Sequence, residues 1–392
     1  MTVKNLQWRL MQNNILREDL NAVIRFLKKI PRLTQSNQVR RFEEAWSDWI
    51  GVKYSVFVNS GSSANLITLA ALRELVGTGE VIVPTLTWVS DIAAVLHCGF
   101  KPVFVDINPR TFGMDSGEII RKIGPKTKAV FLTHILGYNA LSRKLLTVLK
   151  QRAIPLIEDA CESHGAVFEG KKAGAWGYAS NFSFYYAHHL STIEGGMVCT
   201  NDPVFYQTVR MFRAHGLVRE ATDLRMRSRY AKARPDLDPE FIFAFPAYNV
   251  RSTEINAVLG LSQLKRLDEN IRKRNRNFKI FLENLDSEKY ITDFETRGCS
   301  NYAFTLILQP GAKNLAGKVA ETLKRYGIEF RRGTSGGGNQ LRQPYLRKLF
   351  KDAYKKFPNT EHVHFCGFYI GNYPDLKPEK IKALCRLLNV VE

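Results

Sequence analysis

The chain has 392 residues, 45% of them hydrophobic and 24% charged, a composition that indicates a globular protein with two domains, or with one large domain and a smaller one. No apolar run approaches the ~18 residues that cross a bilayer, and the first residues lack the apolar core of a signal peptide, so we expect a cytoplasmic protein with no membrane partner. The formal net charge of +20 attracts anions. The basic runs lie at 224–234, 271–279 and 351–357, and they lack the stacking aromatics or glycine pattern of a nucleic-acid module. This composition favours a small anionic substrate over nucleic acid.

Short apolar runs alternate with amphipathic stretches after a first segment that reads as a helix ending near Pro31. The expected strands cover 54–60, 80–85, 101–107, 128–135, 154–160 and 181–187, with helices at 62–76 and 140–152. This alternation predicts βαβ crossovers and a mostly parallel, covered sheet. Residues 251–285 predict one or two long helices, and the rest predicts a smaller α+β domain. We place the domain boundary between residues 258 and 259.

The turn "VNSGSSAN" follows the first expected strand and precedes a helix. Free N–H groups at such a helix start bind phosphate, and Gly61 and Ser62 lie at this point. The turn matches neither the dinucleotide fingerprint nor the P-loop. A serine-rich helix cap without any ligand is the alternative.

Two further strand ends carry side chains suited to a flat aromatic ligand. Trp88 in "VPTLTWVSD" suits stacking on a ring, although this stretch alone favours a core tryptophan. Asp159 in "IEDACESHGA" can pair with a protonated ring nitrogen, and its alternative is a helix N-cap; Glu162 follows it. Together with the phosphate turn, these groups match the needs of pyridoxal phosphate.

The lysine that normally binds this cofactor covalently is missing, since residues 173–231 contain none. The pair His188–His189 lies in this stretch. A catalytic base, a packed core pair and a metal site are the three interpretations. Adjacent residues on a strand point to opposite faces, so a shared metal ion is disfavoured, and we expect a structural role for His189.

Six motifs give the chain a resemblance to the sugar aminotransferase family of fold-type I pyridoxal phosphate proteins, which acts on nucleotide-linked 4-keto sugars. The motifs are "NSGSSAN", "VPTLTWVSD", "IEDACESHGA", "SFYYAHHLSTIEGGMV", "RAHG" and "YNVRSTEINAVLGLSQL". The resemblance implies an aspartate-aminotransferase-like α/β fold: a three-layer α/β/α large domain with a mostly parallel sheet, and a smaller C-terminal α+β domain.

The resemblance also implies roles for individual residues, in a homodimer with a shared active site. By carry-over, Gly61, Ser62 and Ser183 contact the cofactor phosphate, Trp88 stacks on the ring, Asp159 pairs with its nitrogen, Glu162 lies near its 3-hydroxyl, Asn249 reaches the phosphate in the neighbouring subunit, and His215, Arg219 and Arg251 lie near the substrate or the subunit boundary.

His188 falls where the usual members carry their lysine, and a histidine there is typical of the 4-keto-6-deoxysugar 3-dehydratases, as are the stretches at 331–346 and 364–374. Members with an iron–sulfur cluster carry a CxC after this point, whereas residues 200–298 contain no cysteine. The resemblance therefore implies the cluster-free type that uses GDP-4-keto-6-deoxymannose and L-glutamate, in dideoxysugar and O-antigen biosynthesis, with His188 as catalytic base. A nucleotide-sugar 4-aminotransferase and a non-catalytic binding protein are the alternatives, and the sequence does not specify the nucleotide or the sugar.

Overall fold

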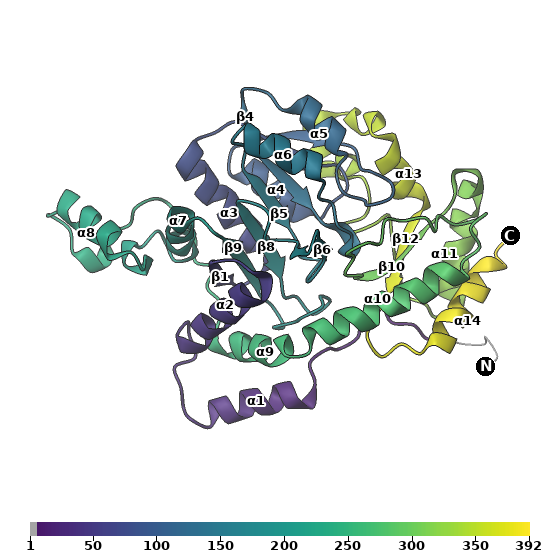
Figure 1. The fold of residues 1–392 in the computed structure, drawn as a ribbon, viewed down its shortest axis with the longest axis horizontal. Coiled ribbons are helices and arrows are strands. Elements are labelled where there is room, and N and C mark those ends of the chain that lie inside the picture. Colours follow the sequence, from purple (N-terminus) through teal and green to yellow (C-terminus); the bar gives the residue numbers. More distant parts are fainter. Residues whose placement is uncertain (1–5) are drawn as a thin grey trace.

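The computed structural model describes residues 6–392 and shows a large α/β domain beside a smaller domain (Figure 1). The strands are β1 (Tyr54–Val58), β2 (Glu80–Pro84), β3 (Lys101–Val105), β4 (Thr127–Thr133), β5 (Leu156–Asp159), β6 (Val167–Phe168), β7 (Lys171–Lys172), β8 (Ala179–Ser183), β9 (Gly196–Thr200), β10 (Ala303–Ile307), β11 (Phe330–Arg332) and β12 (Gly367–Gly371). The α-helices are α1 (Arg17–Leu27), α2 (Asn37–Ile50), α3 (Gly61–Val76), α4 (Val89–His97), α5 (Ser116–Lys122), α6 (Arg143–Gln151), α7 (Pro203–Arg213), α8 (Leu224–Ala233), α9 (Glu254–Leu264), α10 (Leu267–Asn284), α11 (Ala316–Arg325), α12 (Pro344–Phe350), α13 (Pro358–Cys366) and α14 (Pro378–Asn389).

The large sheet has seven strands in the order β1-β9-β8-β5-β4-β2-β3. All neighbours pair in parallel except β9, which runs antiparallel between β1 and β8. Apolar side chains from α3, α4 and α7 cover one face, and those from α2, α5, α6 and α9 cover the other. Burial on both faces explains why the strands read as continuous apolar runs. The predicted three-layer fold is confirmed.

The small domain contains an antiparallel sheet in the order β10-β12-β11. Helices α11 and α14 pack on it, and α10 runs from the core of the large sheet to this second core (Figure 1). Trp8 is fully buried here and its indole N–H donates to the carbonyl of Gly371 at 2.8 Å. The N-terminal segment therefore contacts the small domain, and the predicted boundary at 258/259, which falls inside α9, stays a prediction.

Two local expectations were wrong. Within the described residues, the first segment is helical only over Arg17–Leu27; residues 6–16 contain no helix, and Trp8 bridges to Ile328 before β11. The strand expected at 181–187 ends at Ser183, so His188 and His189 lie in a loop and the argument from opposite strand faces does not apply. The antiparallel strand β9 was not expected at all.

Candidate active site

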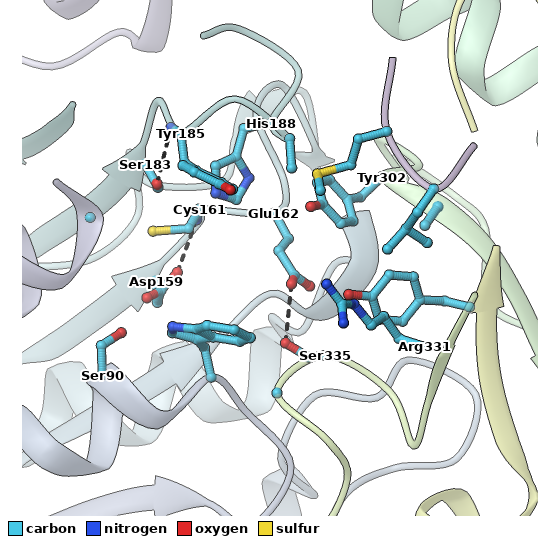
Figure 2. A pocket seen from close by; sticks show the side chains of 18 of the residues that line it. Ser90, Asp159, Cys161, Glu162, Ser183, Tyr185, His188, Tyr302, Arg331 and Ser335 are labelled. Carbon is cyan, nitrogen blue, oxygen red and sulfur yellow. Dashed lines mark hydrogen bonds between the residues drawn. The ribbon is translucent and has the colours of Figure 1, made fainter. Parts of the chain in front are cut away.

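A cavity of about 670 Å³ lies where the carboxyl ends of the parallel strands meet the small domain. Seven of the predicted site residues line it: Gly61, Ser62, Trp88, Asp159, Glu162, Ser183 and His188. Figure 2 shows that the side chains of Asp159, Glu162 and His188 point into this space from one side, opposite Arg331 and Ser335 of the small domain. Such a position outside the strand ends is where open α/β sheets bind their ligands.

The start of α3 forms one wall of the cavity. Ser60 caps the helix by accepting a hydrogen bond from the Ser63 N–H at 3.0 Å, which leaves the N–H groups of Gly61 and Ser62 without a helical acceptor. A Cβ on Gly61 would lie 2.6 Å from the Cβ of Ser183. The start of α3 and the end of β8 are therefore too close for a side chain at position 61. This arrangement of N–H and hydroxyl donors fits a phosphate group.

Gly61→Ala is therefore expected to weaken binding of pyridoxal phosphate by about tenfold or more, because overpacking of this kind costs ~1–3 kcal/mol. A titration of the cofactor followed by tryptophan fluorescence measures the change. Gly317→Ala is the matched control, since a Cβ there meets nothing within 4 Å, and it is expected to bind the cofactor as the wild type does. Unchanged affinity in Gly61→Ala would contradict the phosphate assignment.

Asp159 is the last residue of β5 and is only 4% exposed. Its carboxylate accepts hydrogen bonds from the Cys161 N–H at 2.9 Å and from the amide of Asn65 at 3.0 Å. No helix starts at this point, so the N-cap interpretation was wrong. Trp88, at the start of α4, is 52% exposed, so the interpretation as a core tryptophan was also wrong. Asp159 and Trp88 line the same cavity. A carboxylate that pairs with a ring N–H and an indole that stacks on the ring face suit a protonated aromatic ring.

Glu162 connects the two domains across the cavity. One carboxylate oxygen accepts from the Leu136 N–H at 2.8 Å, and the other accepts from the Ser335 hydroxyl at 3.1 Å (Figure 2). Burial raises the pKa of Glu162 to about 7, against the two hydrogen bonds that lower it. The group can therefore be a neutral hydrogen-bond donor at slightly acidic pH and a carboxylate at slightly basic pH.

The structure separates the two adjacent histidines. His188 lines the cavity, with its ring 5.5 Å from that of Tyr302 and 6.4 Å from that of Tyr185. Burial, and after it the charge of Arg274, lowers the pKa of His188 to about 3, so the imidazole is neutral and can accept a proton. His189 points elsewhere: its ring is buried and its Nε2 lies 3.1 Å from the Ser300 carbonyl oxygen.

No cluster of three or more potential metal ligands occurs among residues 6–392. Within the same residues, no helix combines the length and apolar character needed to cross a membrane. The metal interpretation of the histidine pair therefore finds no third ligand in the described part of the chain.

Four predicted residues do not line the cavity in this single chain: Asn249, His215, Arg219 and Arg251. Asn249 and His215 are exposed, and Arg219 and Arg251 are partly buried. The segment around Asn249 and Arg251 bridges to the end of β1 and to Ala214. The Asn249 side chain accepts from Arg251 Nε at 3.0 Å, and the Arg219 guanidinium lies 4.9 Å from the Phe241 ring centre.

Some cavity residues were not predicted as site residues. Tyr302 and the segment 10–12 gave no signal in the sequence, whereas Arg274 and Asn372 lie in the noted stretches 271–279 and 364–374. Their positions are set by packing between segments far apart in the chain rather than by a local motif. Among the lining residues within the described chain there is no lysine.

The fold and the cavity define a fold-type I enzyme that depends on pyridoxal phosphate. Residues 14–389 match the DegT/DnrJ/EryC1/StrS aminotransferase family, and the chain belongs to this family. It is 32% identical over 381 residues to a GDP-4-keto-6-deoxy-D-mannose 3-dehydratase of Yersinia pseudotuberculosis, covering 95% of each chain. It is 36% identical over 238 residues to a GDP-perosamine synthase of Caulobacter vibrioides, covering 60% of this chain and 58% of the relative.

Solved structures agree with this assignment. The Escherichia coli GDP-4-keto-6-deoxy-D-mannose 3-dehydratase with bound hydrated pyridoxal phosphate superposes with a TM-score of 0.89 at 29% identity, over 97% of this chain and 99% of that one. A structure of such a dehydratase with a trapped adduct of the cofactor and glutamate has the same TM-score of 0.89, at 29% identity over 97% and 100%. A histidine-to-asparagine variant of such a dehydratase, with bound GDP-perosamine, has a TM-score of 0.87 at 28% identity, over 97% of this chain and 100% of that one.

Proposed function

We propose that the protein is a 3-dehydratase that removes the C3 hydroxyl of a nucleotide-linked 4-keto-6-deoxy sugar, GDP-4-keto-6-deoxymannose in the first instance, with L-glutamate as the amino donor. The observation that carries this proposal is that His188 lines a cofactor cavity in which no described lining residue is lysine. An aminotransferase needs a lysine to bind the cofactor and to release the aminated product. Histidine supplies a base but no stable covalent bond.

No covalent bond to the cofactor is needed at this site. Gly61, Ser62 and Ser183 would bind its phosphate, Trp88 would stack on its ring, and Asp159 would pair with the protonated ring nitrogen. When bound, the cofactor in its pyridoxal and pyridoxamine forms carries the amino group and stabilises negative charge on the carbon next to its ring.

His188 would take a proton from that carbon and pass it to the hydroxyl group at sugar C3, which leaves as water. A pKa of about 3 keeps the imidazole neutral before the ligands bind. The phosphate, diphosphate and carboxylate groups that enter with the ligands favour the protonated imidazole, so ligand binding strengthens the base when it is needed.

The electrons balance between the two substrates. Replacing the C3–OH of the sugar with C3–H needs two electrons and yields water. The oxidation of glutamate to 2-oxoglutarate and ammonia supplies these electrons and consumes one water. The net products are the 3-deoxy-4-keto sugar, 2-oxoglutarate and ammonia, consistent with a role in dideoxysugar and O-antigen biosynthesis in the cytoplasm.

A homodimer with a shared active site accounts for the exposed surface that contains Asn249, His215, Arg219 and Arg251. In this arrangement, the surface of one subunit completes the cavity of the other, and Asn249 reaches the phosphate there. The exposure of Asn249 and its position beside the end of β1 support this proposal.

The 3-dehydratases among the relatives support the proposed reaction, since they match nearly the whole chain. The GDP-perosamine synthase, which matches 60% of the chain at 36% identity, supports a second candidate, a nucleotide-sugar 4-aminotransferase. Incubation with pyridoxal phosphate, L-glutamate and a panel of GDP-, CDP- and dTDP-linked 4-keto sugars, followed by mass spectrometry, separates the two. A product one oxygen atom lighter than its substrate supports the dehydratase, and an amino sugar supports the alternative.

The affinity for pyridoxal phosphate is expected to fall as the pH rises through about 7, the pKa of Glu162. Below this pH the neutral carboxyl group of Glu162 would donate a hydrogen bond to the 3-hydroxyl oxygen of the cofactor. Above this pH the carboxylate would repel the anionic cofactor. Glu162→Gln remains a donor at every pH, so its affinity is expected to stay constant where the wild type loses about tenfold between about pH 6 and about pH 9. Fluorescence titrations measure both, and the same decline in the variant would contradict this role.

A further inference from the structure

Arg274 of α10 is a buried cation without a carboxylate partner. Its side chain is 6% exposed, and Nη1 donates to the carbonyl oxygen of Tyr302 at 2.8 Å and to that of Asn372. Its Nε is buried without a hydrogen-bond partner. The two carbonyls belong to the residues just before β10 and just after β12, so the small domain fixes the position of the guanidinium.

Arg213, the other arginine that is buried among the described residues, donates to Glu43 at 2.6 Å. The partly buried Arg266 donates to Asp19. No ion pair within residues 6–392 includes Arg274. Burying a charge without a partner is costly and uncommon. Because Arg274 lines the cavity, its missing partner can come from a ligand.

The location of Arg274 favours one kind of anion. Arg274 and His188 line the same cavity, and after burial the charge of Arg274 is the second cause that lowers the pKa of His188, so the guanidinium lies near the proposed base. An amino acid carries its α-carboxylate two bonds from the reacting amine, whereas the diphosphate of a nucleotide sugar is separated from C3 and C4 by the sugar ring. Arg331 and Arg332 also line the cavity, are exposed, and suit the more distant diphosphate.

We propose that Arg274 binds the α-carboxylate of the amino donor and thereby holds its reacting amine near His188. The inference rests on the proposed function for the identity of the donor. The planar guanidinium offers paired N–H groups that match a carboxylate. The carbonyls of Tyr302 and Asn372 hold it in place before the donor arrives, which reduces the entropic cost of binding.

Two half-reactions, measured separately, test this role. In the first, L-glutamate is added to protein loaded with pyridoxal phosphate, and the single-turnover change in cofactor absorbance is followed for the wild type, Arg274→Gln, Arg274→Lys and Arg272→Gln. In the second, pyridoxamine phosphate is supplied directly, and the conversion of the sugar is followed by mass spectrometry without any glutamate. Arg272 is the matched control, because it is an exposed arginine on the same helix.

Arg274→Gln is expected to slow the glutamate half-reaction by about 10²-fold, the loss typical of a buried charge-assisted pair, and to leave the sugar half-reaction within about threefold. Arg274→Lys keeps the charge but not the paired donors, so an intermediate rate supports the assignment. Arg272→Gln is expected to match the wild type. The inference is overturned if Arg274→Gln reacts with glutamate at the wild-type rate, or if both half-reactions fall equally.

The wild-type protein provides a second test that does not depend on the folding of a variant. L-2-Aminobutyrate lacks the side-chain carboxylate and 4-aminobutyrate lacks the α-carboxylate. Because Arg274 is proposed to bind the α-carboxylate, 4-aminobutyrate is expected to react about 10²-fold more slowly than glutamate, and L-2-aminobutyrate is expected to lose less. A 4-aminobutyrate rate equal to that of glutamate would overturn the inference. An amino-sugar product in the second half-reaction would reject the dehydratase function alone, because the glutamate half-reaction is common to both functions.

Discussion

Replacing His188 with asparagine is expected to lower sugar dehydration by about 10²–10⁴-fold, the usual contribution of a positioned general base, while pyridoxal phosphate still binds. Asparagine keeps the approximate size and polarity of the imidazole but does not accept a proton. Cofactor binding is expected to persist because the proposed contacts with phosphate, ring face and ring nitrogen involve other residues. The rate of formation of the 3-deoxy sugar, with a cofactor titration on the same sample, measures both effects.

His189→Asn is the matched control for this substitution. His189 is adjacent in sequence and equally aromatic, but its ring contacts Ser300 rather than the cavity. The variant is expected to lose some stability, because a buried ring is removed, and to keep near wild-type turnover per folded molecule. If His188→Asn retained activity, or if His189→Asn lost it in the folded state, the assignment of the base would be wrong.

Replacing Asp159 with asparagine is expected to reduce turnover by about 10²–10³-fold, a loss typical of removing one preorganised electrostatic group from an active site. The neutral amide no longer favours the proton on the ring nitrogen, so the ring stabilises negative charge less well. Cofactor affinity falls as well, because a charge-assisted hydrogen bond is lost. Steady-state kinetics and the absorbance of the bound cofactor measure these losses.

Asp91→Asn is the control for Asp159→Asn. Asp91 is fully buried, and the Asn65 amide that donates to Asp159 also donates to Asp91 at 2.8 Å. Burial, and after it the nearby charge of Asp159, raises the pKa of Asp91 well above its usual value, which disfavours its charged form. Turnover is expected to stay within about fivefold of the wild type. Equal losses in both variants would mean that packing, not the charge of Asp159, matters here.

Much of the fold could be predicted from the sequence, because strands buried on both faces appear as uninterrupted apolar runs and the helices between them are amphipathic. Strand β9 was missed because its five residues, Gly196–Thr200, carry no sign of their direction. The true end of β8 was also missed, since the aromatic residues after Ser183 continue the pattern of a strand while the chain turns into a loop.

The site was predictable only in part, for physical reasons that differ between residues. Asp159 is the last residue of a strand, and Gly61 follows the turn after one. Local sequence therefore indicates both where these residues lie and what they can bind. No local motif marks Arg274. Its role follows from the fact that the folded, described part of the chain places no carboxylate beside its guanidinium, which the sequence does not show. Asn249 lies outside the cavity of its own chain, and its proposed role depends on a second subunit.

The fate of the donor nitrogen tests the central claim most directly. The protein is incubated with pyridoxal phosphate, GDP-4-keto-6-deoxymannose and L-glutamate labelled with heavy nitrogen, and the label is measured in free ammonia and in the sugar nucleotide. A dehydratase that uses His188 as base is expected to release the label as ammonia, one equivalent for each 3-deoxy-4-keto sugar formed. Label retained in an amino sugar that still carries its C3 oxygen would contradict the account.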